Sequence, residues 1–212
     1  MKTNVLSAHP RGWEGPAALV GGLLWLVSYG ADLAFGLQTG HEPTDASASG
    51  LAALSATTFS LGLACLGFTM VRLGARLRAH SPWAGTAGLL LGAVVLASGI
   101  ISAIALSGLL GSLRNLKVAV VPGVLSYFGG TTLLGATGLR APAASHRTAA
   151  CLLAAGFLTP VLVAATTLPL PPGLPSYVVA NLPFALAGAT WLAIGTSLRR
   201  DPAGLLSLPS PG

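Results

Sequence analysis

The stretch Ala84–Leu106, AGTAGLLLGAVVLASGIISAIAL, decides the fold of this 212-residue chain. It holds 23 consecutive residues without a charge. A helix needs about 20 mostly apolar residues to cross the roughly 30 Å hydrocarbon core of a bilayer. The stretch is therefore predicted to be a membrane-spanning helix.

Five further apolar runs of similar length precede and follow it. They are apolar throughout, whereas the strands of a membrane barrel would alternate between polar and apolar residues. The chain is therefore predicted to be all-α, a polytopic membrane protein built as a bundle of six transmembrane helices. The predicted helices cover about 17–37, 51–73, 84–106, 118–139, 148–168 and 176–198. Pro160 and Pro183 are predicted to kink the last two.

The composition supports this interpretation. Apolar residues make up 53% of the chain and charged residues only 8%, against roughly 25% charged residues in a soluble domain. Both a soluble globule and a disordered chain are therefore excluded. The connections between the predicted helices are too short to fold separately, so residues 1–212 are predicted to form one membrane domain.

The basic residues predict the orientation, because Lys and Arg are enriched in cytoplasmic loops. With both termini cytoplasmic, nine basic residues lie inside and only Arg114 and Lys117 lie outside. We therefore expect a multi-pass cell-membrane protein. The basic residues lie at the ends of apolar runs and form no continuous face, so the net charge of +6 does not predict a nucleic-acid partner. The excess of Arg over Lys, with abundant Ala, Gly and Leu, indicates a bacterial source.

Residues that carry chemistry are scarce. Cys65 and Cys151 lie in apolar runs, where cysteine is usually a small buried hydrophobe. The four histidines fall in tails and loops, and no nucleophile–base pair or paired carboxylate is visible. No catalytic residue, cofactor or metal is therefore predicted. A weak alternative is a metal site formed by His41, Glu42 and Asp45 in the first outer loop.

Asp32 is the one candidate for a ligand or ion site. An acidic residue inside a membrane helix is costly and usually faces the bundle interior or a water-filled cavity. Ser28 lies one turn before Asp32, and Tyr177 and Asn181 are predicted at the same depth. These four residues form the candidate site. The alternative is a purely structural Asp32 paired with Arg114 or Lys117.

Small residues recur at helical spacing in three of the predicted helices. In membranes such residues let helices approach closely. They are therefore predicted to form packing surfaces, the alternative being a solvated path along 51–73. The predicted path is Ser55, Thr58, Gly62, Cys65, Thr69 and Arg72, and the predicted packing glycines are Gly62, Gly85, Gly88, Gly92, Gly99, Gly188 and Gly195.

Three functions remain open from the sequence. The first is a non-enzymatic accessory or assembly subunit that acts through helix contacts in the lipid bilayer, with other membrane subunits or copies of itself as partners. The second is a small carrier, or a solute- or lipid-binding protein, that uses an outward-facing polar cavity around Asp32. The third, an intramembrane lipid-modifying enzyme, is the least supported because acid–base catalysis usually needs two positioned groups.

Overall fold

A computed structural model describes residues 12–41, 49–107, 116–140, 146–165 and 175–200, and all regular elements within these ranges are helices. The prediction of an all-helical chain is therefore confirmed. The helices are α1 (Glu14–Thr39), α2 (Gly50–Leu77), α3 (Pro82–Leu106), α4 (Leu116–Arg140), α5 (His146–Ala165), α6 (Ser176–Val179) and α7 (Leu182–Arg200).

Five stretches of the described chain are long and apolar enough to cross a membrane. They are α1, α2, α3, α5 as far as residue 164, and the stretch Ser176–Arg200 that combines α6 and α7. The fourth predicted span, 118–139, lies within α4, but α4 is not one of these five. Several glycines, threonines and a proline make the described part of α4 less apolar than its neighbours.

The last predicted helix, 176–198, is not continuous, which corrects the prediction. The chain turns at Ala180 and Asn181, between α6 and α7. Pro183 explains the break, because proline has no N–H to donate to the carbonyl four residues earlier and its ring clashes with that carbonyl. The break is a two-residue turn beside the predicted kink at Pro183, and Ser176–Arg200 still forms one span, whereas Pro160 lies inside α5.

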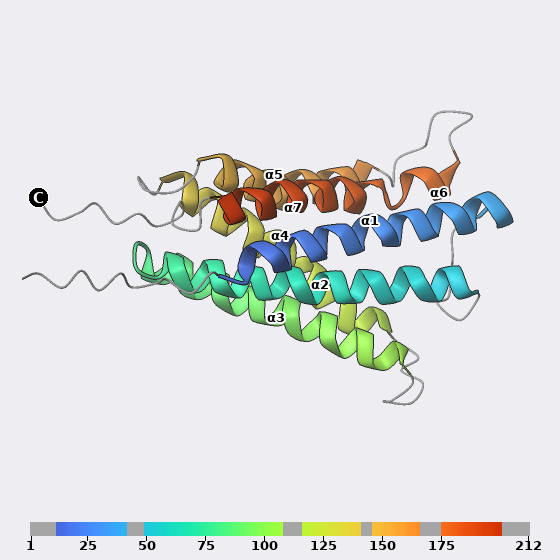
Figure 1. Cartoon of the computed structure of the whole chain (residues 1–212), viewed down its shortest axis with the longest axis horizontal. Coiled ribbons are helices and arrows are strands. Elements are labelled where there is room, and N and C mark those ends of the chain that lie inside the picture. The colour runs from blue at the N-terminus through green and yellow to red at the C-terminus, as the bar shows by residue number, and fades with distance from the viewer. Residues whose placement is uncertain (1–11, 42–48, 108–115, 141–145, 166–174, 201–212) are drawn as a thin grey trace, which may run out of the picture.

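The six long helices lie lengthwise in one bundle (Figure 1). Each contacts the next in chain order, and α7 contacts α1 as well as α5, so by their contacts the six helices form a ring. Neighbours run antiparallel: for example, Gly15 and Gly22 of α1 approach Gly195 and Gly188 of α7 respectively. One end of the bundle therefore holds the start of α1 and the ends of α2, α4 and α7.

Glycines set the distance between the helices. A Cβ at Gly188 would lie 2.8 Å from the backbone oxygen of Gly22, and one at Gly99 would lie 2.7 Å from the backbone oxygen of Ser60. These contacts are closer than any side chain tolerates, so the backbones meet directly. A Cβ at any of the seven predicted packing glycines would lie within 3 Å of a neighbouring atom. That atom belongs to a side chain at Gly62 and Gly88, and backbone lies within 3 Å at the other five.

Large side chains fill the middle of the ring. The Trp25 ring stacks on Phe59 with centroids 5.3 Å apart and meets the edge of Tyr127 at 5.0 Å. Trp191 Nε1 donates a hydrogen bond of 2.8 Å to Tyr127 Oη, so the polar atoms of this pair satisfy each other. The two tryptophans and Tyr127 are almost fully buried and hold α1, α2, α4 and α7 around one core.

The outer surface is apolar along every long helix. Exposed Val, Leu, Ile or Phe side chains occur on α1, α2, α3, α4, α5 and α7, so no single face carries them. A water-soluble protein rarely exposes so much continuous apolar surface. Trp13 and Trp83, each 75% exposed, lie at the end of the bundle where α1 and α3 begin.

Candidate functional site

Asp32 lies on the inner side of α1, toward the helix's carboxyl-terminal half. Its side chain is buried, with 8% of the residue exposed. Asn181, in the turn between α6 and α7, donates a hydrogen bond of 2.7 Å from Nδ2 to Asp32 Oδ2. The structure therefore joins two of the four predicted site residues, which are separated by 149 positions in the chain.

The interruption of the last span positions Asn181. Its backbone oxygen accepts hydrogen bonds from the N–H groups of Phe184 (3.1 Å) and Ala185 (3.2 Å), so Asn181 starts the first turn of α7. Asparagine is favoured at such positions. Its side chain is thereby directed from the helix start toward α1. One turn earlier, the backbone oxygen of Val178 accepts a hydrogen bond of 3.1 Å from Tyr29 Oη.

The other two predicted residues flank Asp32 along α1. Tyr177 packs its ring against Gly36, one turn after Asp32, where a Cβ would overlap it. Ser28, one turn before Asp32, hydrogen-bonds Ser55 of α2, with the two hydroxyl oxygens 3.0 Å apart. All four residues therefore lie along one face of α1, between α2 and the broken span.

The alternative partners predicted for Asp32 lie outside the described residues. Arg114 and the side chain of Lys117 are not among the described residues, and neither are Glu42 and Asp45 of the first outer loop. His41 is described, and its ring packs against Phe35 with centroids 5.7 Å apart. Among the described residues, no three His, Cys, Asp or Glu side chains gather to hold a metal ion.

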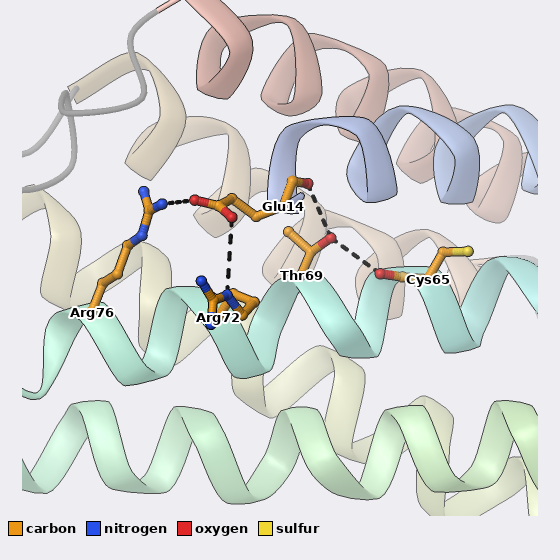
Figure 2. Close-up of polar contacts among 5 residues, drawn as sticks. All are labelled: Glu14, Cys65, Thr69, Arg72 and Arg76. Carbon is orange, nitrogen blue, oxygen red and sulfur yellow. Dashed lines mark hydrogen bonds and ion pairs between the residues drawn. The ribbon is translucent and has the colours of Figure 1, made fainter. Parts of the chain in front are cut away.

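A second buried carboxylate, Glu14, is a site that the sequence analysis missed. It lies in the first turn of α1 at the opposite end of the bundle, with 2% of the residue exposed. Figure 2 shows its carboxylate between two arginines of α2. Glu14 Oε1 forms an ion pair with Arg76, and Oε2 lies 4.0 Å from Arg72 Nε. The hydroxyl of Thr69 donates to the backbone oxygen of Glu14 at 3.3 Å.

The predicted helix boundary explains why Glu14 was missed. The first apolar run was taken to begin at residue 17, which assigns Glu14 to a tail, whereas α1 begins at Glu14 itself. Two signals were available. Acidic residues favour the first turn of a helix because they face its positive end. Arg72 and Arg76 also have the i, i+4 spacing that places both on one face of a helix.

The predicted polar path along 51–73 lies against α1. Ser55 meets Ser28, Thr69 meets the backbone of Glu14, and a Cβ at Gly62 would lie 2.5 Å from the Trp25 ring. These contacts are those of a packing surface, and they favour that interpretation over a solvated path.

Comparison with known protein families, with curated proteins and with solved structures gives no match for this chain.

Proposed function

We propose that the protein is a small multi-pass carrier of the cell membrane that binds a proton or a metal cation at Asp32. The hydrogen bond between the Asp32 carboxylate and Asn181, at the interruption between α6 and α7, is the observation that carries this proposal. The lipid bilayer surrounds the bundle, and both termini are cytoplasmic, so the Asp32 end faces outward.

A carboxylate is rare within an apolar span. Burying an ionised group away from water is costly unless it is paired, so such groups generally mark ion pathways or proton relays. Asn181 is a neutral amide, so its hydrogen bond orients the Asp32 carboxylate without neutralising it. Ser28, Tyr29 and Tyr177 add neutral oxygen atoms along the same face of α1.

The broken helix gives independent support. Membrane carriers commonly place their ion sites where a spanning helix is interrupted, because the interruption frees backbone carbonyls and directs helix ends toward the ligand. Here the interruption lies between Val179 and Leu182, beside Asp32.

The accessory-subunit hypothesis has less support from the geometry. It was motivated by glycine surfaces that could join one subunit to another, but the seven packing glycines contact other parts of the same chain. The enzyme hypothesis has less support, because the partners described along this face of α1 offer an amide and hydroxyl groups.

Asp32→Asn is expected to abolish the response of the protein to its cation. The change keeps the shape of the side chain and removes its charge. We expect the melting temperature of the wild type in lipid nanodiscs to rise with one of Na⁺, K⁺ or Li⁺ at constant ionic strength, or with acidity. A ligand at a hundred times its Kd stabilises by about 2.7 kcal/mol, which corresponds to about 5–10 °C in a chain of this size.

Thr131→Val is the matched control, because it removes a buried hydroxyl that hydrogen-bonds the backbone of its own helix α4, without altering the charge or the candidate site. It should keep the full cation or proton response, at a slightly lower melting temperature. The proposal is wrong if Asp32→Asn responds as the wild type does, or if the wild type responds to none of the cations and to no change of pH.

The orientation predicts which loops are reachable from outside the cell. On a background in which Cys65 and Cys151 are replaced by alanine, Ala48→Cys should react with an impermeant maleimide in intact cells, and Ala79→Cys should not. Ala48 lies outside the described residues, in the first outer loop, while Ala79 is exposed at the end of α2. Moving each charge across the membrane costs about 2.3 kcal/mol per 100 mV, so the basic residues oppose inversion. Labelling confined to Ala79→Cys would reverse the orientation.

A further inference from the structure

We propose that Arg72 binds the phosphate group of an anionic phospholipid at the end of the bundle where α1 begins. This inference rests on the proposed insertion into a bilayer but not on the ligand of Asp32. The bound chemistry is a phosphate monoanion, and the source is a lipid headgroup in the surrounding leaflet.

This end of the bundle is strongly basic. In the described residues it carries seven arginines, six of them exposed, and Glu14 is its one carboxylate. Six of them lie in the terminal turns of α2, α4, α5 and α7 or directly beyond them, and Arg72 lies one turn deeper in α2. Basic groups at a membrane surface attract anionic lipids. The seven are Arg72, Arg76, Arg78, Arg140, Arg147, Arg199 and Arg200.

Arg72 differs from the others in depth and in pairing. It lies one helical turn further into the apolar span than Arg76. Glu14 pairs closely with Arg76, whose side chain is 24% exposed, whereas the side chain of Arg72 is 51% exposed and only its Nε approaches Glu14, at 4.0 Å. Figure 2 shows the two arginines at different oxygens of the carboxylate. Of the two arginines beside Glu14, Arg72 is therefore the one that can accept a second anion.

The exposed tryptophans place Arg72 near the phosphate layer. Trp13 directly precedes Glu14, and Trp83 begins the neighbouring α3. Tryptophan side chains in such positions lie at the level of the lipid headgroups. Exposed apolar side chains begin at Val20 on α1, about two turns beyond Glu14. A guanidinium at this level binds phosphate well because its planar fork can donate two parallel hydrogen bonds.

Native mass spectrometry of lipid retention tests the site. The full chain is released from nanodiscs of phosphatidylcholine that contain a minority of phosphatidylglycerol, and the retained lipids are counted. We expect the wild type to retain phosphatidylglycerol preferentially and Arg72→Gln to lower its affinity about fivefold. Arg200→Gln, which removes an exposed arginine at the end of α7, is the matched control and should change retention little. Arg72→Lys keeps the charge but not the fork and should fall between the two.

Three results would overturn the inference. One is equal retention by Arg72→Gln and the wild type in protein that has entered nanodiscs and melts as the wild type does. Another is an equal loss in Arg200→Gln, which would mean that the arginines act only through their summed charge. The third is displacement of phosphatidylglycerol by inorganic phosphate at matched ionic strength, which would assign the site to free phosphate. Failure to enter nanodiscs at all would instead contradict the proposed membrane insertion.

Discussion

Arg76→Ala is expected to destabilise the bundle by about 3 kcal/mol, because it leaves the Glu14 carboxylate buried without its closest counter-charge. Removing one partner of a buried ion pair usually costs 3–5 kcal/mol. The lower end of that range applies because the side chain of Arg76 retains 24% exposure and Arg72 lies on the other side of Glu14. Equilibrium unfolding with a denaturing detergent in mixed micelles measures the loss.

Further variants separate the loss of the counter-charge of Glu14 from the loss of side-chain packing. Glu14→Gln removes the buried charge itself, and the arginines can turn toward water, so it should cost only about 1 kcal/mol. In the Glu14→Gln background, Arg76→Ala should then cost far less than it does alone. Arg200→Ala removes an exposed arginine and should be close to neutral. Equal effects of Arg76→Ala with and without Glu14 would contradict the interpretation of the ion pair.

Adding one methyl group at Gly99 is expected to cost about 2 kcal/mol, measured by the same unfolding experiment. A Cβ at this position would overlap the backbone of Ala64 and lie 2.7 Å from the oxygen of Ser60. Backbone cannot move aside as a flexible side chain can, so Gly99→Ala forces α3 away from α2. Overpacking of a tight core typically costs 1–3 kcal/mol.

Gly30→Ala provides the opposite case within the same bundle. Gly30 also lies inside a long helix, but a Cβ there meets no atom within 4 Å. Alanine in a helix interior is favoured over glycine by roughly 0.5–1 kcal/mol, so this variant should be neutral or slightly more stable. If Gly99→Ala and Gly30→Ala behaved alike, the direct backbone contact between α2 and α3 would have to be wrong.

The helices themselves were predictable because the signal is local. Each apolar run identifies one helix without reference to any other part of the chain, and the described helices coincide with the six predicted ranges to within a few residues at most ends. The ends differ because polar residues continue a helix after its apolar core stops. Arg76 and Leu77, for example, extend α2 beyond the predicted residue 73.

The arrangement of the helices in a ring was only partly predictable. The short connection after α5 predicts that the last two spans are neighbours, and the hydrogen bond of 2.8 Å between Thr148 and Ser197 joins them. The contact between α1 and α7 is different, since Gly22 and Gly188 are far apart in the chain. Glycines at this spacing occur in several of the helices, so the spacing alone did not show which two helices would pack together.

The candidate site was also predictable only in part. Asp32 stood out because it is a charge inside an apolar run, and depth alone suggested Asn181 and Tyr177 as neighbours. What the sequence did not reveal is the hydrogen bond between Asp32 and Asn181, which depends on the interruption at Pro183 and on the ring that brings α1 beside it. Glu14 was missed for a simpler reason, because it was counted with the amino-terminal tail.

Closure of the ring by α1 and α7 also has a consequence for biosynthesis. A chain is synthesised from its amino terminus, so α1 and α2 can pair early, and Glu14 reaches Arg76 as soon as the second helix is complete. The opposite flank of α1, with Gly15, Gly22 and Gly36, has to wait for the last residues of the chain. Until α6 and α7 arrive, that flank and the Asp32 carboxylate are without the contacts that these helices and Asn181 supply in the folded chain. The final helix thus completes the assembly of the first.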